Sequence, residues 1–367
     1  MKKQTIVVKI GSSSLTNEQG EIDDVKLTSH VEAITELKKA GHTVILVSSG
    51  AVAAGFKQLG YPNRPVTVKG RQAAAAVGQG LLIQAYNEKF QEHGFIAAQI
   101  LLTRSDFANR NRYRNAFQTI NELLTQNIIP IINENDTVAI DELTFGDNDM
   151  LSALVSGFIH ADQLIILTDI DGIYTDNPMR NPDAKKYNFL EDITDEVLAQ
   201  ASSEGSSVGT GGMKSKLLAA KTALSLGVSV FVGKGEGKDK LVHILKGKGA
   251  GTYIQNPSMS TVNTSRQWIA LHSEAVAKIY VDQGAEEAVL YRGRSLLPAG
   301  IIKLEGEFEK GDVVEVYGTR GLIGKGEVNY SSQEVREELI LRKEQKKERK
   351  KINPSIEIIN RDYWVEI

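Results

Sequence analysis

The chain has 367 residues, enough for two or three domains, and its lack of cysteine excludes disulfides, thiolate metal sites and cysteine nucleophiles. With 41% hydrophobic and 24% charged residues, its composition is that of an ordinary soluble globular protein. The formal net charge of −3 argues against a protein that binds polyanions over its whole surface.

Six apolar segments alternate with segments of helical periodicity in the first two thirds of the chain. These segments are continuously apolar, which is typical of strands buried on both faces in a parallel sheet flanked by helices. We therefore predict an α/β fold with a mainly parallel sheet between helix layers. The predicted strands are residues 5–10, 43–50, 95–103, 128–136, 163–169 and 228–233. The predicted helices include residues 24–39, 70–93, 111–126, 148–160 and 212–226.

The sequence pattern changes near residue 256. A stretch rich in Pro, Ser, Thr and Asn is followed by short segments with alternating apolar residues and many glycines. We predict a first domain over residues 1–256, a linker over 257–274 and a small, mostly β domain over 275–367. Residues 336–351 carry eight basic and four acidic side chains, which we interpret as a solvated helix, with a nucleic-acid patch as the alternative.

No segment has the features of a membrane span or a leader. The uncharged stretch at residues 73–86 is shorter than the ~20 residues that a bilayer requires. The basic start is not followed by a cleavage site of small residues. We therefore expect a cytoplasmic protein without membrane contact. The six histidines are scattered, so we also expect no metal site built by the protein.

Two common nucleotide-binding motifs, GxxxxGK[ST] and GxGxxG, are absent. Ligands of open α/β sheets bind beyond the carboxyl ends of the strands, so the loops there are the candidate sites. In the first loop, Lys9 would need an anionic partner if buried, and Gly11 allows close approach to phosphate; an edge-strand lysine facing solvent is equally compatible. The second, residues 48–51, fits an anion site or an ordinary capped turn.

The three later loops add further polar groups. Asn and Asp are dense at residues 133–136 and 146–149, which favours recognition of a small polar ligand over turn and capping roles alone. Residues 168–178 directly follow a predicted strand. Residues 209–216 form a glycine-rich helix start with Lys216 one turn in, a pattern that suits phosphate but is weak alone.

Taken together, these loops resemble the amino acid kinase family in order and context. The matching features are a lysine-glycine first strand, a serine-glycine end of the second, TDxxGxYTxxP and GTGGMxxK. Within that family the chain is similar to the glutamate 5-kinases, and the resemblance covers nearly its whole length. It includes SSGAVAAG, INENDTVA, FGDNDMLSALV and DQGAEEAVLYRGRSLLPAGI, the last of which is similar to the start of a PUA domain.

The resemblance implies a reaction and its participants. Glutamate 5-kinases transfer a phosphoryl group from ATP to the γ-carboxylate of L-glutamate, the first step of proline biosynthesis, so the implied cofactors are ATP and Mg²⁺. Lys9 and Lys216 are the implied cations beside the transferring group, and Asp149 is implied to hold both by ion pairing.

The resemblance also implies two sets of binding residues, none of them a metal ligand. The ATP-binding set is Lys9, Gly11, Thr168, Asp169, Thr210, Gly211, Gly212, Met213, Lys214, Ser215 and Lys216. The glutamate-binding set is Ser49, Asp136 and Asn148, with Asn133 as a supporting residue.

Elementary chemistry agrees with a carboxylate acceptor. A glutamate side chain, with a pKa near 4.3, is ionised at pH 7, so the transfer needs no general base. Asp136 suits the α-ammonium of free glutamate, a charge that N-acetylglutamate lacks. Aspartate is shorter and would reach the phosphate poorly from the same anchor.

The resemblance suggests further partners. Proline is an expected inhibitor, a homodimer or homotetramer is the expected assembly, and a transient contact with the next proline-pathway enzyme is a further expected interaction. PUA domains usually bind RNA, so a protein that binds RNA and retains only the kinase fold is the alternative function. The intact Lys9, Asp149 and Lys216 and the net charge argue against that alternative.

Overall fold

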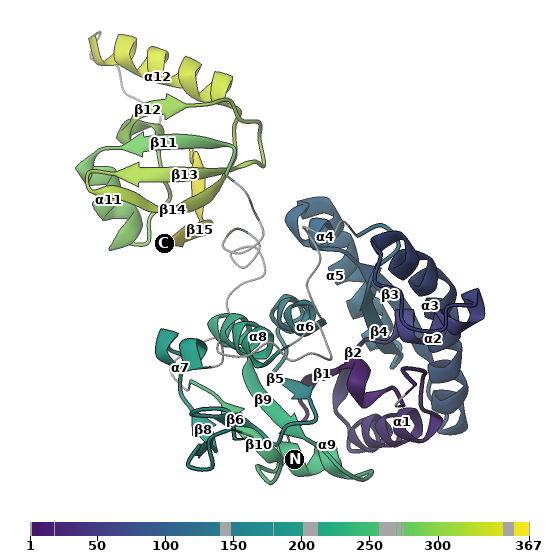
Figure 1. Ribbon diagram of the computed structural model, residues 1–367. Coiled ribbons are helices and arrows are strands. Elements are labelled where there is room, and N and C mark those ends of the chain that lie inside the picture. The colour runs from purple at the N-terminus through teal and green to yellow at the C-terminus, as the bar shows by residue number, and fades with distance from the viewer. Residues whose placement is uncertain are drawn as a thin grey trace. The chain divides into compact units, whose positions relative to one another are not determined.

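The computed structural model describes residues 2–17, 19–139, 148–178, 180–200, 212–256, 269, 273, 275–347 and 356–366. The chain divides into two compact units (Figure 1). The first comprises residues 1–106 and 111–261, and the second comprises residues 262–367 together with 107–110. Most of the predicted linker, 257–274, lies outside the described residues and stays a prediction.

The first unit is built on an eight-stranded sheet in the order β3–β4–β2–β1–β5–β9–β10–β8. The six strands from β3 to β9 run parallel, β10 is antiparallel to β9, and β8 pairs in parallel with β10. This confirms the predicted α/β class. The bounds are β1 Thr5–Ile10, β2 Thr43–Ser48, β3 Ala97–Leu102, β4 Ile129–Glu134, β5 Gln163–Leu167, β8 Phe189–Leu190, β9 Ser229–Lys234 and β10 Ala250–Ile254.

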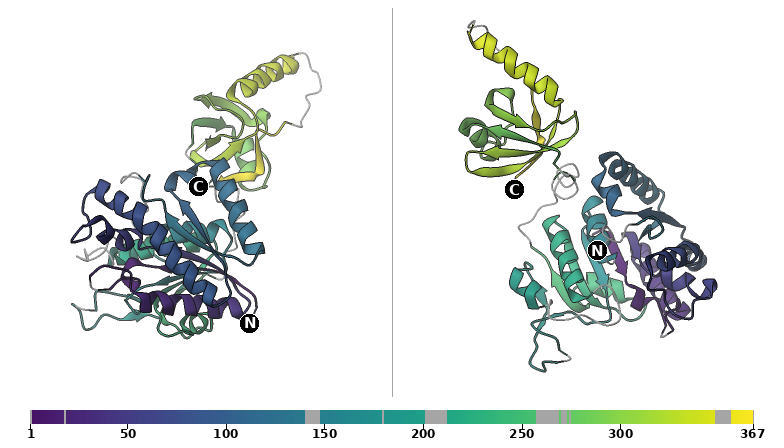
Figure 2. Two further views of the ribbon diagram at one scale, coloured as in Figure 1. Left: turned by 90° about the vertical axis from the view of Figure 1, so that its right-hand side faces the viewer. Right: turned by 45° about the horizontal axis from the view of Figure 1, so that its top comes forward.

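Helices cover both faces of this sheet. Their bounds are α1 Asp24–Lys39, α2 Ala51–Gly55, α3 Val68–Glu92, α4 Arg104–Ala108, α5 Arg110–Thr125, α6 Asn148–Phe158, α7 Asp195–Gln200, α8 Met213–Ser225 and α9 Lys240–Leu245. Helices α1 and α3 contact each other and cross the same side of the sheet (Figure 2). Short elements complete the unit: η1 Ser12–Ser14, η2 Lys57–Leu59, and a β6 (Ile173–Tyr174) and β7 (Lys186–Tyr187) hairpin.

The central strand β1 directs alternate side chains to the two helix layers. Ile6, Val8 and Ile10 belong to the core that they share with apolar residues of α1, α3 and α9. Since strand side chains alternate, Lys9 faces the opposite layer, where α6 contacts β1 and packs on α8. A lysine is thereby placed between two helices rather than in solvent.

The predicted elements of the first unit match the observed ones closely, with differences at the sheet edges. The strand at residues 5–10 and the helix at 24–39 have the predicted bounds. Strand β3, predicted to be buried on both faces, is an edge strand with partly exposed side chains. Strands β8 and β10 were not predicted, because β8 has two residues and β10 contains Gly251 and Thr252 within a short segment.

The second unit is a small β domain, as predicted. Its five strands have the order β12–β11–β13–β14–β15, antiparallel except for the parallel β11–β13 pair. The bounds are β11 Ala277–Val281, α11 Gln283–Leu290, η5 Pro298–Gly300, β12 Ile301–Glu305, β13 Val313–Gly318, β14 Gly321–Val328, α12 Ser332–Lys347 and β15 Ile359–Glu366. The helix predicted in the basic run is observed as α12, which is described up to Lys347.

No helix among the described residues is both long enough and apolar enough to cross a membrane.

Candidate active site

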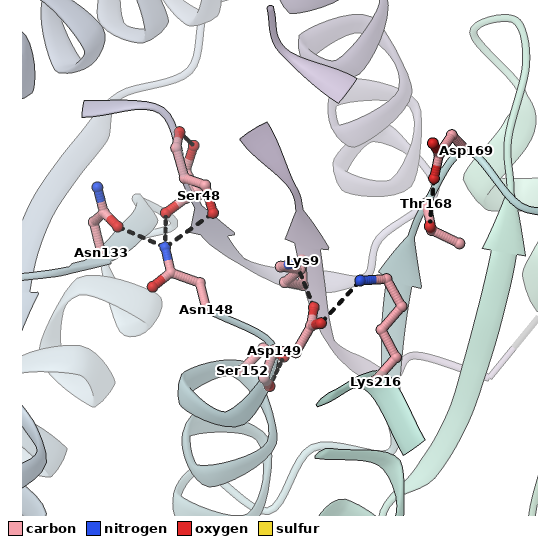
Figure 3. A network of polar contacts seen from close by, with 10 residues as sticks. Lys9, Ser48, Asn133, Asn148, Asp149, Ser152, Thr168, Asp169 and Lys216 are labelled. Carbon is pink, nitrogen blue, oxygen red and sulfur yellow. Dashed lines mark hydrogen bonds and ion pairs between the residues drawn. The ribbon is translucent and has the colours of Figure 1, made fainter. Parts of the chain in front are cut away.

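Five parallel strands end at one edge of the large sheet. The carboxyl ends of β1, β2, β4, β5 and β9 lie along the same edge because these strands are parallel. Helices α6 and α8 begin at this edge, so their first turns face the strand ends (Figure 3). The arrangement collects side chains from Lys9 to Lys216 in one place.

A buried carboxylate bridges two buried lysines at the centre of this edge. The Asp149 carboxylate forms an ion pair with Lys9 through Oδ1, and its Oδ2 lies 3.0 Å from Lys216 Nζ (Figure 3). Asp149 is fully buried, and Lys9 and Lys216 are 3% and 8% exposed. Lys9 comes from β1, Asp149 from the first turn of α6 and Lys216 from the first turn of α8.

The three charges leave a net positive charge of one in a buried setting. Two ammonium groups placed together without Asp149 would repel each other and lose hydration, so the carboxylate makes their joint burial possible. The remaining positive charge attracts an anion more strongly here than it would at the surface, because the local dielectric constant is low. This group is suited to an anionic ligand with several negative oxygens.

A cluster of amides and hydroxyls lies beside the charged group. Asn148 Nδ2 donates to Ser48 O at 2.6 Å, to Ser49 Oγ at 3.1 Å and to Asn133 Oδ1 at 2.7 Å. Asn148 and Asp149 are neighbours at the start of α6, so one helix terminus supplies both the amide cluster and the bridging carboxylate. The structure thus brings together Ser49, Asn133 and Asn148.

The sequence reasoning missed two buried residues of α3 that contact this cluster. Gln79 Oε1 accepts a hydrogen bond from Asn133 Nδ2 at 2.8 Å, and the Tyr86 hydroxyl lies 3.0 Å from Ser48 Oγ. They are seven residues apart and therefore lie on one face of the helix. Polar groups on the apolar face of a long helix are the signal that could have revealed them.

Asp136 lies two residues beyond β4, in a different electrostatic setting. Burial raises the pKa of its carboxyl group, and the positive charges of Arg64 and Arg71 act in the opposite direction. Neither arginine was singled out in the sequence. The Asp136 carboxylate is therefore not an isolated negative charge, because the positive charges of two arginines act on it.

The other candidate residues lie on the β5, β9 and α8 side. Thr168 donates its hydroxyl to Asp169 Oδ1 at 3.0 Å, and its backbone N–H donates to Gly233 O at 3.0 Å (Figure 3). Gly212 caps α8 in an extended conformation ahead of Met213, Lys214 and Ser215. Thr210 and Gly211 lie outside the described residues.

Close glycine contacts hold α2 and α3 against each other behind the second loop. A Cβ added to Gly78 would lie 1.8 Å from Ala51 O, and one added to Gly55 would lie 2.1 Å from Ala74 O. Gly50 begins α2 at φ +106°, a conformation that favours glycine. The glycines of SSGAVAAG therefore permit a backbone contact that fixes the position of α3.

The side chains at this edge fit a metal ion that is bound mainly by the phosphate oxygens of a ligand. Among the described residues, no three His, Cys, Asp or Glu side chains lie close enough to hold an ion. Mg²⁺ usually keeps several waters and takes one or two carboxylates plus substrate phosphates. Asp169, exposed at the end of β5, is a carboxylate of the required kind.

Comparisons with known proteins agree with this arrangement. The amino acid kinase family model matches residues 4–234, and the PUA domain model matches residues 277–346. The chain is 62% identical over 367 residues to glutamate 5-kinase 1 of Bacillus licheniformis and 59% identical to glutamate 5-kinase 1 of Bacillus subtilis, covering 100% of each chain. The chain belongs to the glutamate 5-kinases of the amino acid kinase family.

A solved structure has the same fold as the first unit. A carbamate kinase from Giardia lamblia bound to AMP-PNP matches 70% of this chain and 99% of its own, with a TM-score of 0.52 and 18% identity. At that identity the likeness concerns the fold alone. The reaction of this kinase is inferred from its sequence relatives and from the geometry of its site.

Proposed function

We propose that this kinase transfers the γ-phosphoryl group of ATP to the γ-carboxylate of L-glutamate, giving γ-glutamyl 5-phosphate as the first step of proline biosynthesis. The observation that carries the proposal is the buried Lys9–Asp149–Lys216 group directly beside the amide cluster of Asn148. One part suits a triphosphate, and the other suits a small molecule with both a carboxylate and an ammonium group.

The chemistry requires charge neutralisation more than proton transfer. Because the acceptor carboxylate is already ionised, no general base is needed. The obstacle is the approach of an anionic acceptor to an anionic donor, and charge also spreads over the transferring oxygens. Lys9 and Lys216, held by Asp149, would stabilise that charge from fixed positions, without reorganisation during the reaction.

The nucleotide would occupy the side of the site formed by Thr168, Asp169 and the start of α8. The backbone N–H groups after Gly212 and the positive end of the thirteen-residue helix suit phosphate oxygens. Mg²⁺, when bound, would offset phosphate charge, and Asp169 is the side chain best suited to reach its hydration shell. Lys9 and Gly11 would contact the phosphates from β1.

The acceptor would bind on the other side, against Ser49, Asn148 and Asp136. The amide orientation of Asn148 leaves its carbonyl oxygen facing away from Ser48 and Asn133, available to an ammonium group (Figure 3). Asp136 adds a carboxylate for the same ammonium, and Arg64 and Arg71 add positive charge that suits the α-carboxylate. Free glutamate is favoured over N-acetylglutamate because acetylation removes the ammonium charge.

The test is acceptor-dependent ADP formation by the purified chain with ATP and Mg²⁺. We expect ADP release that depends on L-glutamate, with far lower rates for aspartate and N-acetylglutamate. Release that is equally fast without any acceptor, or with N-acetylglutamate, would contradict the proposal.

We also infer that proline inhibits this kinase by overlapping the glutamate site. Proline carries a cationic amine, which Asn148 and Asp136 are proposed to recognise, and an α-carboxylate, which suits the positive charge of Arg64 and Arg71. Inhibition should then be relieved by high glutamate. Inhibition that persists at saturating glutamate would exclude the overlap.

A further inference from the structure

A single face of α3 places two polar side chains against the ends of two strands. Its buried residues include Ala75, Leu82 and Phe90, which are apolar, and Gln79 and Tyr86, which are not. Gln79 is 9% exposed. A polar amide in such a place is costly unless it forms hydrogen bonds, so its contacts indicate its role.

The contacts form a chain from α3 to the acceptor side of the site. Gln79 Oε1 accepts from Asn133 Nδ2 at 2.8 Å. Asn133 Oδ1 then accepts from Glu134 N at 2.9 Å and from Asn148 Nδ2 at 2.7 Å. The Asn133 amide uses its NH₂ toward Gln79 and its oxygen toward Asn148, so its orientation links the amides on its two sides.

The geometry points to Gln79 as a positioning residue for the acceptor. Its oxygen holds the Asn133 amide, and Asn133 holds the Asn148 amide, whose carbonyl oxygen is left to face the substrate. This inference rests on the proposed function, since it assigns the substrate ammonium to Asn148. Gln79 itself touches no reacting atom in this account.

The position of Gln79 is fixed by its neighbour in the sequence. Gly78 lies so close to Ala51 O that no side chain fits between α3 and α2. The backbone of α3 is therefore held at this point, and the Gln79 side chain starts from a defined place. Without its acceptor, the buried Nδ2 of Asn133, a residue that is 2% exposed, would lose its partner.

The test is a double-mutant cycle on the full chain with steady-state kinetics. Gln79→Met removes the acceptor at similar volume, and Asn133→Ala removes its partner. We expect Gln79→Met to raise the KM for glutamate about tenfold, with the KM for ATP nearly unchanged. Combined with Asn133→Ala, it should add little, because both changes break one chain. Gln79→Glu keeps an acceptor oxygen, so its glutamate KM should be much closer to that of the parent chain than the KM of Gln79→Met is.

Leu82→Ala is the matched control, because Leu82 lies on the same helix face and is 2% exposed. It should lower Tm but leave the glutamate KM unchanged, and its effects should add to those of Asn133→Ala. The positioning role is overturned if Gln79→Met behaves like Leu82→Ala. If Gln79→Met does not fold, Gln79→Leu replaces it. The role is also overturned if Gln79→Glu raises the glutamate KM as much as Asn133→Ala does. An unmutated chain inactive with glutamate would instead contradict the proposed function.

Discussion

At the scale of single residues, the adjacent side chains Asn148 and Asp149 point in two directions from the first turn of α6. Asn148 contacts the ends of β2 and β4, and Asp149 contacts Lys9 and Lys216. Adjacent helical residues project about 100° apart, so one short segment can serve two ligands. Because these two residues are adjacent in the chain, the acceptor side and the phosphate side of the proposed site are held at a fixed spacing.

The two lysines should contribute mainly to turnover. Lys9→Ala or Lys216→Ala should lower kcat about 10²-fold or more, because their charge matters most as the phosphoryl group transfers. Lys221→Ala is the control, since Lys221 lies exposed on α8 in an ion pair with Asp195. Near-normal kcat in a folded Lys9 or Lys216 variant, measured by ADP release, would contradict the assignment.

Asp136 should act on acceptor binding. Asp136→Asn keeps the volume of the side chain but removes its charge, so the KM for glutamate should rise while the KM for ATP changes little. The positive charges of the nearby Arg64 and Arg71 would remain, so the effect should be larger on ammonium binding than on carboxylate binding. Equal changes in both KM values would indicate a structural role instead.

The sequence predicted Lys9, Asp149 and Lys216 for the site, but it indicated neither Gln79 nor the two arginines near Asp136. Lysine and aspartate in strand-end loops stand out against an apolar background, and the family resemblance assigns them roles. Gln79 is 54 positions from Asn133, and Ser48 is 100 positions from Asn148. Contacts over such separations depend on how α3 and α6 pack on the sheet, which local patterns do not encode.

At the scale of elements, α1 is joined to the loop after β1 by a buried histidine. His30 Nε2 lies 3.0 Å from Ser14 O, and since a carbonyl only accepts, Nε2 carries the proton. Burial, reinforced by the charges of Lys240 and Lys26, lowers the pKa of His30 to about 4. The neutral ring is therefore part of how α1 docks beside the active-site edge.

This histidine should destabilise the fold in mild acid. Its pKa is lower in the folded chain than the usual 6.5, so its contribution is complete above pH 6.5 and is lost as the pH falls toward 4. The shift corresponds to roughly 3 kcal/mol at 1.36 kcal/mol per pKa unit. His30→Gln, compared by urea unfolding from pH 7 to 4, should lose less stability over this range than the parent chain.

The control for that experiment is His243→Gln, because His243 is exposed at the surface of α9. Its unfolding free energy should follow the parent curve. If His30→Gln also follows the parent curve throughout, the histidine does not titrate as described.

Elements with strong periodicity were predicted well, and weakly patterned ones were not. Helix α1 has the predicted bounds because its apolar residues follow the helical period, and β1 has them because its continuous apolar run ends at Gly11. Strand β3 looked central but is an edge strand, since an apolar run does not reveal how many neighbours a strand has. The two-residue strand β8 depends on pairing with β10 and has no pattern of its own.

At the scale of the whole molecule, the described residues that we propose for the site all belong to the first unit. Every described residue proposed for the site lies between Lys9 and Lys216, while the second unit has its own core of buried residues. The two units divide at residue 261, within the stretch that the sequence predicts as a linker. We therefore propose that the PUA domain modulates the kinase rather than completes its site.

A chain ending at Thr264 should fold and phosphorylate glutamate, because its sheet and its proposed site are complete. We expect changes in proline inhibition, Mg²⁺ dependence or assembly rather than loss of turnover, as checked by circular dichroism and glutamate-dependent ADP release. A folded truncation without activity would show that the second unit contributes to catalysis.

In the proposed reaction, a carboxylate oxygen of glutamate attacks the γ-phosphorus of ATP. The measurement that tests this step uses glutamate labelled with ¹⁸O in the γ-carboxylate, incubated with ATP, Mg²⁺ and the purified chain. Cyclisation of γ-glutamyl phosphate to 5-oxoproline breaks its C–O bond, so the phosphate released together with 5-oxoproline should carry one ¹⁸O. Phosphate that is released in step with 5-oxoproline but contains no ¹⁸O would contradict attack by the carboxylate oxygen.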